Sequence, residues 1–384
     1  MSSFNSNSLV LTAFLFSFGD ASAQGRLQTP ESDTAVQMCA AIIGNAARLD
    51  CYDQWAGRPP AQAAPRARNL PGPIDTATNS DATTRADNVN TEIARTDACH
   101  DGQYSALSRF WELETDTDCG TFRFRGYRPL SFSAVGADTV NQQPSSNADN
   151  RTAASPINYN NTEARLQLSM RTKLAQGLFM PANSKRQDSL WFAYSQQSYW
   201  QVFSGNISRP FRTTDHEPEV IYVYPTDAKL PFDWRLRYSG VGLVHQSNGQ
   251  SLPLSRSWNR VYLMAGAELD KRWMVQARVW KRLTENAGSD DNPGIENTIG
   301  RGELKTMWNV NQQHTIGLTW LHSLRQDGNG STRLEWLRTI GTRDDGGKSN
   351  LRLHTQLFSG YGDSLIDYNR KRTVFSVGLS LLDF

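Results

Sequence analysis

The chain has 384 residues, of which 38% are hydrophobic and 10% aromatic, and its formal net charge is +2 at pH 7. The small net charge suggests no nucleic-acid partner, and no run approaches the ~20 apolar residues that a membrane-spanning helix needs. A polar average combined with 11 Trp and 12 Tyr favours a transmembrane β-barrel, whose strands alternate lipid-facing and lumen-facing residues. A soluble β-sandwich would also fit the composition alone.

The first residues predict export. Residues 9–18 (LVLTAFLFSF) form a short apolar run, and Ala21, Ser22 and Ala23 provide the small residues of a cleavage site. This pattern predicts a secretory signal peptide over residues 1–23. A buried helix is the alternative, but the polar, proline-bearing sequence that follows argues against a core element.

Residues 24–120 form a predicted periplasmic N-terminal extension whose role the sequence does not define. Within it, residues 32–55 have apolar side chains at helical spacing. Residues 57–92 are rich in Pro, Ala, Thr and Asn, which is the composition of a disordered linker.

All four cysteines lie in this extension. An exported chain meets an oxidising compartment, so disulfides are expected. Of the three possible connectivities, we prefer the pairs Cys39–Cys51 and Cys99–Cys119. Metal binding is the weaker interpretation, because no CxxC or histidine-rich spacing accompanies the cysteines.

From about residue 121, alternating segments recur with polar turns between them, and they predict twelve strands, an even number as expected for a bacterial barrel. The predicted strands are residues 121–136, 162–177, 189–204, 217–226, 233–246, 258–270, 272–284, 296–310, 313–325, 331–341, 349–359 and 371–383. The final Phe384, with Leu382 two positions before it, is similar to the assembly signal of outer-membrane barrels. The sequence therefore predicts an all-β fold, a transmembrane antiparallel β-barrel over residues 121–384.

The segment from His245 to Arg260 (HQSNGQSLPLSRSWNR) carries candidate catalytic residues. His245 and Ser247 are two apart, so on a strand they point to the same side, and a hairpin turn would return Asn259 beside His245. A serine hydroxyl needs a base to take its proton, and the base needs a third group to hold one tautomer. The alternative is an ordinary polar hairpin loop, since His, Ser and Asn are common in loops.

Strand parity predicts where this trio faces. Val261 and Leu263 share the parity of Asn259, and Val241 and Leu243 share that of His245, so the trio should face lipid. If both termini are periplasmic, the loop over residues 246–257 is extracellular. The candidate site then lies at the outer leaflet, where an enzyme would meet a phospholipid ester.

Several motifs carry a resemblance to a known family. They are HxSNGxSxxxSRSWNR from His245, QLFSGYGDSLIDYN from Gln356, SQQSYWQ from Ser195, SRPFR from Ser208, and Glu217-Pro218. Over about residues 120–384 the chain resembles the outer membrane phospholipase A family. The resemblance implies a calcium-dependent, dimeric acyl hydrolase of the bacterial outer membrane that cleaves sn-1 and sn-2 esters of phospholipids and lysophospholipids.

The resemblance also implies a Ca²⁺ site. Its ligands would be the Gln250 carbonyl, the Ser255 hydroxyl and the carbonyl of Ser208 of the partner subunit, all hard oxygen donors. Gln250 stands where the family often has Arg, a change that a carbonyl ligand tolerates. A second, weaker calcium site is doubtful, because its Asp would align with Leu252. For Ser208 and Ser255 the alternative is an ordinary loop serine.

Two further residues have predicted roles. The backbone N–H of Gly249, close after Ser247, could donate to the oxyanion of an acyl-transfer intermediate. Gln196 shares parity with apolar residues of its strand, where an unpaired amide is costly, and the resemblance implies that it lies at the homodimer interface. A glutamine that reaches water is the alternative.

The first hypothesis is therefore a phospholipase A1/A2, a carboxylic ester hydrolase with His245, Ser247 and Asn259 as catalytic residues. The alternative is a non-enzymatic outer-membrane porin or structural barrel, which would concentrate its polar residues in the lumen. A soluble lipase is disfavoured, because no GxSxG elbow surrounds Ser247.

Overall fold

The computed structural model describes residues 39–42, 47–48, 51–52, 102–181, 183–326, 328–341 and 349–381. The chain divides into two units, Met1–Thr78 and Asn79–Phe384. In the first unit, Cys39 and Cys51 form a disulfide, which confirms that predicted pair. Cys119 in the second unit is also disulfide-bonded, but its predicted partner Cys99 lies outside the described residues. So do the predicted signal peptide, the linker, most of the predicted helix over 32–55, and Leu382 and Phe384.

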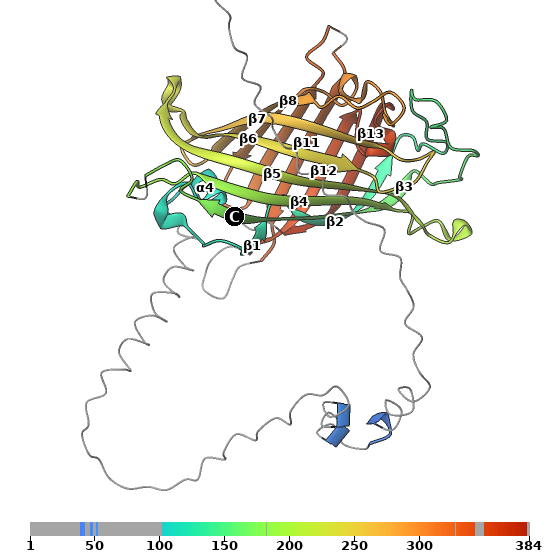
Figure 1. The fold of residues 1–384 in the computed structure, drawn as a ribbon, viewed down its shortest axis with the longest axis horizontal. Helices are drawn as coiled ribbons and strands as arrows, with labels where there is room; N and C mark the ends of the chain where they lie inside the picture. The colour runs from blue at the N-terminus through green and yellow to red at the C-terminus, as the bar shows by residue number, and fades with distance from the viewer. Residues whose placement is uncertain are drawn as a thin grey trace, which may run out of the picture. The chain divides into compact units, whose positions relative to one another are not determined.

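Twelve antiparallel strands of the second unit, β2 to β13, close into a barrel (Figure 1). Each strand pairs with its neighbours along the chain, and β13 pairs with β2, so the closed sheet has no edge to protect. The strands are β2 (Leu130–Ala137), β3 (Thr162–Gln176), β4 (Ser189–Trp200), β5 (Phe211–Lys229), β6 (Arg235–Ser247), β7 (Ser257–Leu269), β8 (Trp273–Arg282), β9 (Gly302–Asn309), β10 (His314–His322), β11 (Gly330–Thr339), β12 (Leu351–Gly360) and β13 (Arg372–Leu381). The predicted all-β fold and its twelve strands are confirmed.

The first predicted strand is interrupted. A short strand, β1 (Phe124–Gly126), pairs with the second half of β3, whereas β2 pairs with the first half. Between them lie Tyr127, Arg128 and Pro129, and proline cannot donate a ladder hydrogen bond. The break turns two consecutive side chains inward: Arg278 donates a 2.6 Å hydrogen bond to the Tyr127 hydroxyl, and Arg128 pairs with Glu217 at 2.6 Å.

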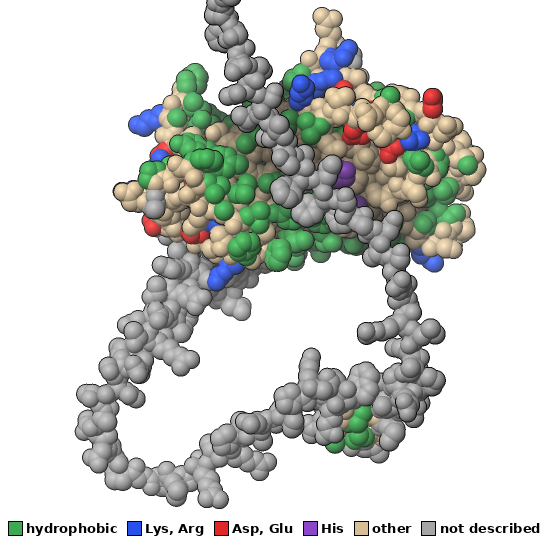
Figure 2. Space-filling model, viewed as in Figure 1, with side chains coloured by type: hydrophobic (Ala, Val, Ile, Leu, Met, Phe, Trp, Pro, Cys, Tyr) green, Lys and Arg blue, Asp and Glu red, His purple; other side chains and the backbone are tan. Residues whose placement is uncertain are grey.

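Side chains alternate between the outer wall and the lumen, as the sequence pattern predicts. On β13, Phe375 and Leu379 are 52% and 48% exposed, whereas Val374 and Ser376, which flank Phe375, are buried. Hydrophobic side chains cover much of the visible flank of the barrel, and charged ones gather toward its ends (Figure 2). This is the surface that a barrel needs in a bilayer.

The lumen is filled with paired charges. Arg212 and Glu163 are both fully buried and lie 2.6 Å apart, and a second nitrogen of Arg212 lies 2.7 Å from Asp367. Buried charges of this kind need partners, because desolvation of a lone charge costs several kcal/mol. This part of the interior is therefore a packed polar core.

A helix that the sequence analysis did not predict, α4 (Ala106–Trp111), packs against the inner face of the barrel. The Ser105 side chain accepts from the N–H of Ser108 and caps the helix. Trp111 is 1% exposed and lies with its ring centroid 5.9 Å from that of Trp191 on β4. Within the described residues, no helix is long and apolar enough to cross a membrane.

Apart from the interrupted first strand, the largest differences from the prediction are the starts of β5 and β9. β5 begins six residues earlier than expected, at Phe211, because its first part is polar and Pro218 obscures the alternation. β9 begins six residues later, at Gly302. Before it, Ile295 and Ile299 are buried in a loop cluster with Trp258, Leu365 and Tyr368, so these apolar residues belong to a loop core.

Short 3-10 helices occur in the connections. They are η1 (Thr115–Thr117), η2 (Gly205–Ile207), η3 (Pro231–Asp233), η4 (Ile295–Asn297) and η5 (Leu365–Asp367).

Candidate active site

The strands β6 and β7 carry the three predicted catalytic residues and lie side by side in the barrel (Figure 1). His245 on β6 is paired in register with Asn259 on β7. His245 follows Val241 and Leu243, which are 39% and 56% exposed on the outer wall. His245 is itself exposed, so the parity argument placed it on the correct face.

The hairpin brings the imidazole and the amide together. His245 Nδ1 lies 2.9 Å from Asn259 Oδ1. Because an amide oxygen only accepts, the Nδ1 atom must carry the proton in this contact. The remaining ring nitrogen, Nε2, is then unprotonated in neutral imidazole and can act as a base.

Ser247 ends β6 two residues after His245, on the same side of the strand. Its register partners are His216 on β5 and Ser257 on β7. Among the described residues, no hydrogen bond joins Ser247 to His245, and such catalytic contacts are often long before substrate binds. The structure therefore joins His245 to Asn259 and leaves Ser247 adjacent.

The loop after Ser247 is held by the buried side chain of Asn248. Its amide donates to the Leu254 carbonyl at 2.8 Å, and its oxygen accepts from the N–H of Arg256 at 2.9 Å. Gly249 follows with φ +62°, a conformation that glycine adopts without strain. Gly249, the predicted oxyanion donor, therefore lies in a loop that the Asn248 side chain holds through two hydrogen bonds.

A second histidine near this loop was missed by the sequence analysis. The ring of His216 lies 3.5 Å from the point where a Cβ of Gly249 would stand. His216 Nδ1 lies 2.7 Å from the Tyr194 hydroxyl, which donates to Gln196 Oε1 at 3.0 Å. Only the pairing of β5 with β6 brings His216 here, and no local motif signals that pairing.

Gln196 lies on the outer wall, as predicted, and is half-buried. Besides accepting from Tyr194, its amide nitrogen donates to Ser198 Oγ at 3.2 Å. Tyr194 and Ser198 of the same strand therefore each provide one hydrogen bond to this amide, which leaves one N–H and one lone pair for a further partner.

The loop between β6 and β7 contains two of the predicted calcium ligands, Gln250 and Ser255. The Ser255 hydroxyl donates to Asp291 Oδ2 at 2.5 Å, a carboxylate that the sequence analysis did not assign. The Gln250 amide nitrogen donates to the Arg212 carbonyl at 3.2 Å, while its buried Oε1 has no hydrogen-bond partner among the residues that the structure describes. An unpaired amide oxygen and a carboxylate near a hydroxyl are hard donors that suit calcium.

Ser208, the third predicted ligand, lies in a different loop. It is exposed at the end of η2, in the loop between β4 and β5. No hydrogen bond within the described residues joins it to Gln250 or Ser255. The described part of the chain contains no group of three or more His, Cys, Asp or Glu side chains arranged to hold a metal ion, so any calcium site here depends mainly on carbonyl, amide and hydroxyl oxygens.

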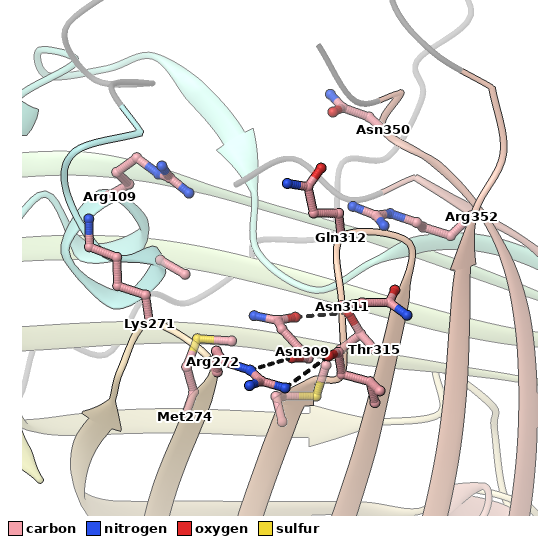
Figure 3. A pocket seen from close by; sticks show the side chains of 13 residues that line it. Arg109, Lys271, Arg272, Met274, Asn309, Asn311, Gln312, Thr315, Asn350 and Arg352 are labelled. Carbon is pink, nitrogen blue, oxygen red and sulfur yellow. Dashed lines mark hydrogen bonds between the residues drawn. The ribbon is translucent and has the colours of Figure 1, made fainter.

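Two cavities of the barrel lie apart from the candidate catalytic residues. One of about 650 Å³ lies at the opposite end, among Arg109, Lys271, Arg272 and Arg352 (Figure 3). Its cations support turns: Lys271 donates to the Gln103 carbonyl at 2.6 Å, and Arg272 to the Val310 carbonyl at 2.9 Å. A lumenal cavity measures about 300 Å³. His245, Ser247 and Asn259 line neither cavity.

Comparison with known proteins identifies the family. The family model described as phospholipase A1 matches residues 107–381. The chain belongs to the phospholipase A1 family. This phospholipase is 33% identical over 364 residues to a putative phospholipase A1 of Neisseria meningitidis serogroup B, covering 91% of each chain. It is 34% identical over 226 residues to phospholipase A1 of Escherichia coli, covering 59% of this chain and 72% of the relative.

Solved structures of relatives agree. Outer membrane phospholipase A from Escherichia coli superimposes with a TM-score of 0.59 at 30% identity, over 68% of this phospholipase and 100% of that chain. A Salmonella typhi outer membrane phospholipase, crystallised as a dimer with bound calcium, gives 0.58 at 29% identity, over 68% and 93%. The predicted family, fold, hydrolase activity and outer-membrane location are confirmed, and the non-enzymatic porin is set aside.

Proposed function

We propose that this phospholipase hydrolyses the sn-1 and sn-2 acyl esters of phospholipids and lysophospholipids with Ser247 as nucleophile, His245 as base and Asn259 as the orienting residue. The observation that carries the proposal is the 2.9 Å contact between His245 Nδ1 and Asn259 Oδ1, on the outer wall, two residues from Ser247. A triad that faces lipid can receive an ester directly from the bilayer. The sn-1 and sn-2 esters could both reach a triad on this exposed outer wall.

Acylation begins when Ser247 Oγ attacks the ester carbonyl carbon while His245 Nε2 takes the hydroxyl proton. The Asn259 oxygen accepts from Nδ1–H, so it keeps the ring in the tautomer that leaves Nε2 free. The carbon–oxygen bond to glycerol then breaks, and the imidazolium gives its proton to the departing oxygen. Water repeats the sequence on the acyl-enzyme and releases the fatty acid.

Charge on the tetrahedral intermediate needs donors that are already in position. The Gly249 N–H is the proposed donor, held in a loop that Asn248 fixes through the Leu254 carbonyl and the Arg256 N–H. One such donor is typically worth ~3–4 kcal/mol of transition-state stabilisation.

Calcium is the proposed cofactor, held by the Gln250 carbonyl, the Ser255 hydroxyl and the carbonyl of Ser208 of the partner subunit. When bound, the ion supplies positive charge that stabilises the developing oxyanion. The unpaired Gln250 Oε1 and the Asp291 carboxylate beside Ser255 support a cation in this loop. Ser208 is exposed at the end of η2 and makes no hydrogen bond to Gln250 or Ser255 within the described residues, which supports a ligand donated between subunits, with Gln196 as the proposed interface residue.

The proposal is tested by fatty-acid release from phospholipid mixed micelles by the intact chain, in excess calcium and in excess chelator. We expect chelation to lower the rate by about 100-fold or more, the effect of losing charge stabilisation at the oxyanion. A matched assay with lysophospholipid tests the second substrate. An unchanged rate in chelator would contradict calcium dependence, and fatty-acid release by Ser247→Ala at the original rate would contradict the triad.

A further inference from the structure

The orienting role of Asn259 depends on which end of its amide faces the histidine. Oδ1 accepts from His245 Nδ1 at 2.9 Å. If the amide were rotated by 180°, its NH₂ group would face Nδ1–H, and the ring would lose its acceptor. A triad aspartate has two equivalent oxygens and meets no such problem. An asparagine triad therefore needs something that fixes the amide.

A carboxylate lies behind this amide. Asn259 Nδ2 donates to Glu285 Oε1 at 3.5 Å, on the side away from His245. Three side chains from three successive segments thus form a row, in the order imidazole, amide and carboxylate. With a carboxylate on one side, which only accepts, the NH₂ end of the amide is held there and the oxygen end faces the ring.

The backbone explains how Glu285 reaches this position. The N–H of Leu283 donates to the Asn259 carbonyl at 2.8 Å, so the pairing of β7 with β8 continues one residue beyond β8. Glu285 follows two residues later in the connecting loop. Arg282, which precedes this extension, pairs with Asp290 at 2.7 Å and holds the loop back on itself.

The charges around Glu285 come from both adjoining segments. Burial raises the pKa of its carboxyl, and Asp290 and Asp291 act in the same direction, while Arg282 and the Asn259 hydrogen bond oppose them. The side chain is half-buried, so water competes only partly for the carboxylate.

We propose that Glu285 is a positioning residue for the hydrolysis, which acts through Asn259. It fixes the amide with Oδ1 toward His245, and it places a negative charge behind an amide that carries none. That charge polarises the amide toward the imidazolium formed when Ser247 is deprotonated. This inference rests on the proposed function, because it assumes that His245 is the base.

The test uses a two-by-two set of variants in the full chain: wild type, Glu285→Gln, Asn259→Asp and the double variant. Rates are measured on one phospholipid in calcium, with kcat and KM separated. In the wild-type background, Glu285→Gln lets the amide rotate, and we expect kcat to fall about tenfold, the value of one charge-assisted hydrogen bond, with little change in KM.

The Asn259→Asp background should reverse the sign. The carboxylate that this substitution introduces would lie in contact with the carboxylate of Glu285, which raises the pKa of one of the two groups and disturbs the acceptor. Glu285→Gln removes that repulsion and provides an NH₂ group for the introduced carboxylate, so the double variant should be faster than Asn259→Asp alone. A residue that merely supports the loop would change kcat by the same factor in both backgrounds.

Ser289→Ala is the matched control, because Ser289 belongs to the same loop but donates to the Asn286 carbonyl and has no contact with Asn259 or Glu285 among the hydrogen bonds of the described residues. It should change kcat equally in both backgrounds. Circular dichroism confirms that each variant keeps its barrel. Equal factors for Glu285→Gln in both backgrounds, while Ser247→Ala and Asn259→Ala lose activity, would overturn the role of Glu285 alone. Full activity of Ser247→Ala and Asn259→Ala would overturn the triad on which it rests.

Discussion

His245 Nδ1 and Asn259 Oδ1 lie 2.9 Å apart across two paired strands on the outer wall of the barrel. Strand pairing fixes the backbones of both residues, so the contact does not depend on a mobile loop. The position matters for the substrate as well, since an imidazole on this wall is adjacent to lipid and not to the lumen. The proposed site would therefore combine a base held by strand pairing with access from the bilayer.

Replacement of Ser247 by Ala should abolish hydrolysis. Ser247 is the proposed nucleophile and is only half-buried at the end of β6, so its loss removes a reactant without opening a cavity. We expect kcat to fall by at least about 10³-fold, with an unchanged thermal transition. Fatty-acid release from micelles measures the first quantity and circular dichroism the second. Hydrolysis at the original rate would show that another residue attacks the ester.

Replacement of Asn259 by Ala should be milder. The variant keeps the base and the nucleophile but loses the acceptor that holds His245 Nδ1–H. Because asparagine carries no charge, we expect kcat to fall roughly 10- to 100-fold, less than the ~10⁴-fold effect known for a triad aspartate. Single-turnover kinetics with a phospholipid measure this loss. A fall as deep as that of Ser247→Ala would argue that Asn259 supports the hairpin as well as the ring.

Much of the fold could be predicted, because alternation and turn residues are local signals. The strands that carry the site, β6 and β7, were predicted within one or two residues of their ends. The helix α4 was not predicted, because its six residues are too few to show a helical pattern. It packs through Trp111 against Trp191 and Tyr238 on strands distant in the sequence. Local patterns cannot reveal such packing.

The candidate site also contains residues that the sequence predicts and residues that it does not. His245, Ser247 and Asn259 belong to one hairpin, so their spacing and parity predict that they meet. His216 comes from β5 and Glu285 from the loop after β8, and neither stands in the motif. Each reaches the site through strand register: His216 is paired with Ser247, and the backbone of Leu283 is bonded to Asn259. The register between strands that are distant in the chain cannot be predicted from local motifs in a single sequence.

Trp111→Ala should destabilise the barrel. Trp111 is 1% exposed and packs against Trp191 and Tyr238, so truncation leaves a large cavity beneath α4. A buried Trp→Ala change typically costs ~3–5 kcal/mol, and urea unfolding in detergent measures the loss. Phe124→Ala is the control, since Phe124 is 72% exposed on β1 and should change the free energy of unfolding by much less. Equal effects would contradict a structural role for α4.

Acid should weaken the η5 loop. Burial alone would raise the pKa of Asp367, but Arg212 and Arg372, each 2.7 Å away, hold it at about 2, below the ordinary 3.8. A lowered carboxyl pKa contributes stability that is complete above pH 4 and is lost as pH falls toward 2. The difference corresponds to about 2 kcal/mol.

Unfolding at pH 5 and at pH 2.5 measures this loss, and Asp367→Asn is the informative variant. It removes the titrating group and leaves its two guanidiniums partly unpaired, which typically costs ~3–5 kcal/mol. Its stability should therefore be lower at pH 5 and should change less on acidification. A variant with the full wild-type acid dependence would place the titration elsewhere.

Calcium and dimer formation should be linked. The proposed site takes Gln250 and Ser255 from one chain and needs Ser208 of the partner subunit, so a monomer would bind the ion with one ligand fewer. By reciprocity, calcium tightens the dimer by the factor by which the dimer tightens calcium binding. Sedimentation in detergent across a calcium titration should show the dimer fraction rising together with activity.

Gln196→Leu tests the proposed interface. In one chain Gln196 accepts from Tyr194 and donates to Ser198. At a dimer interface the same amide could form hydrogen bonds with the partner subunit, and the leucine of the variant could form none. We expect about tenfold more calcium to be needed for half-maximal dimer, the value of roughly one hydrogen bond. Thr332→Leu, an exposed outer-wall position on β11, is the control and should leave the titration unchanged. A monomer that is fully active in calcium, with no change in mass, would refute the linkage and leave the chemistry of Ser247, His245 and Asn259 intact.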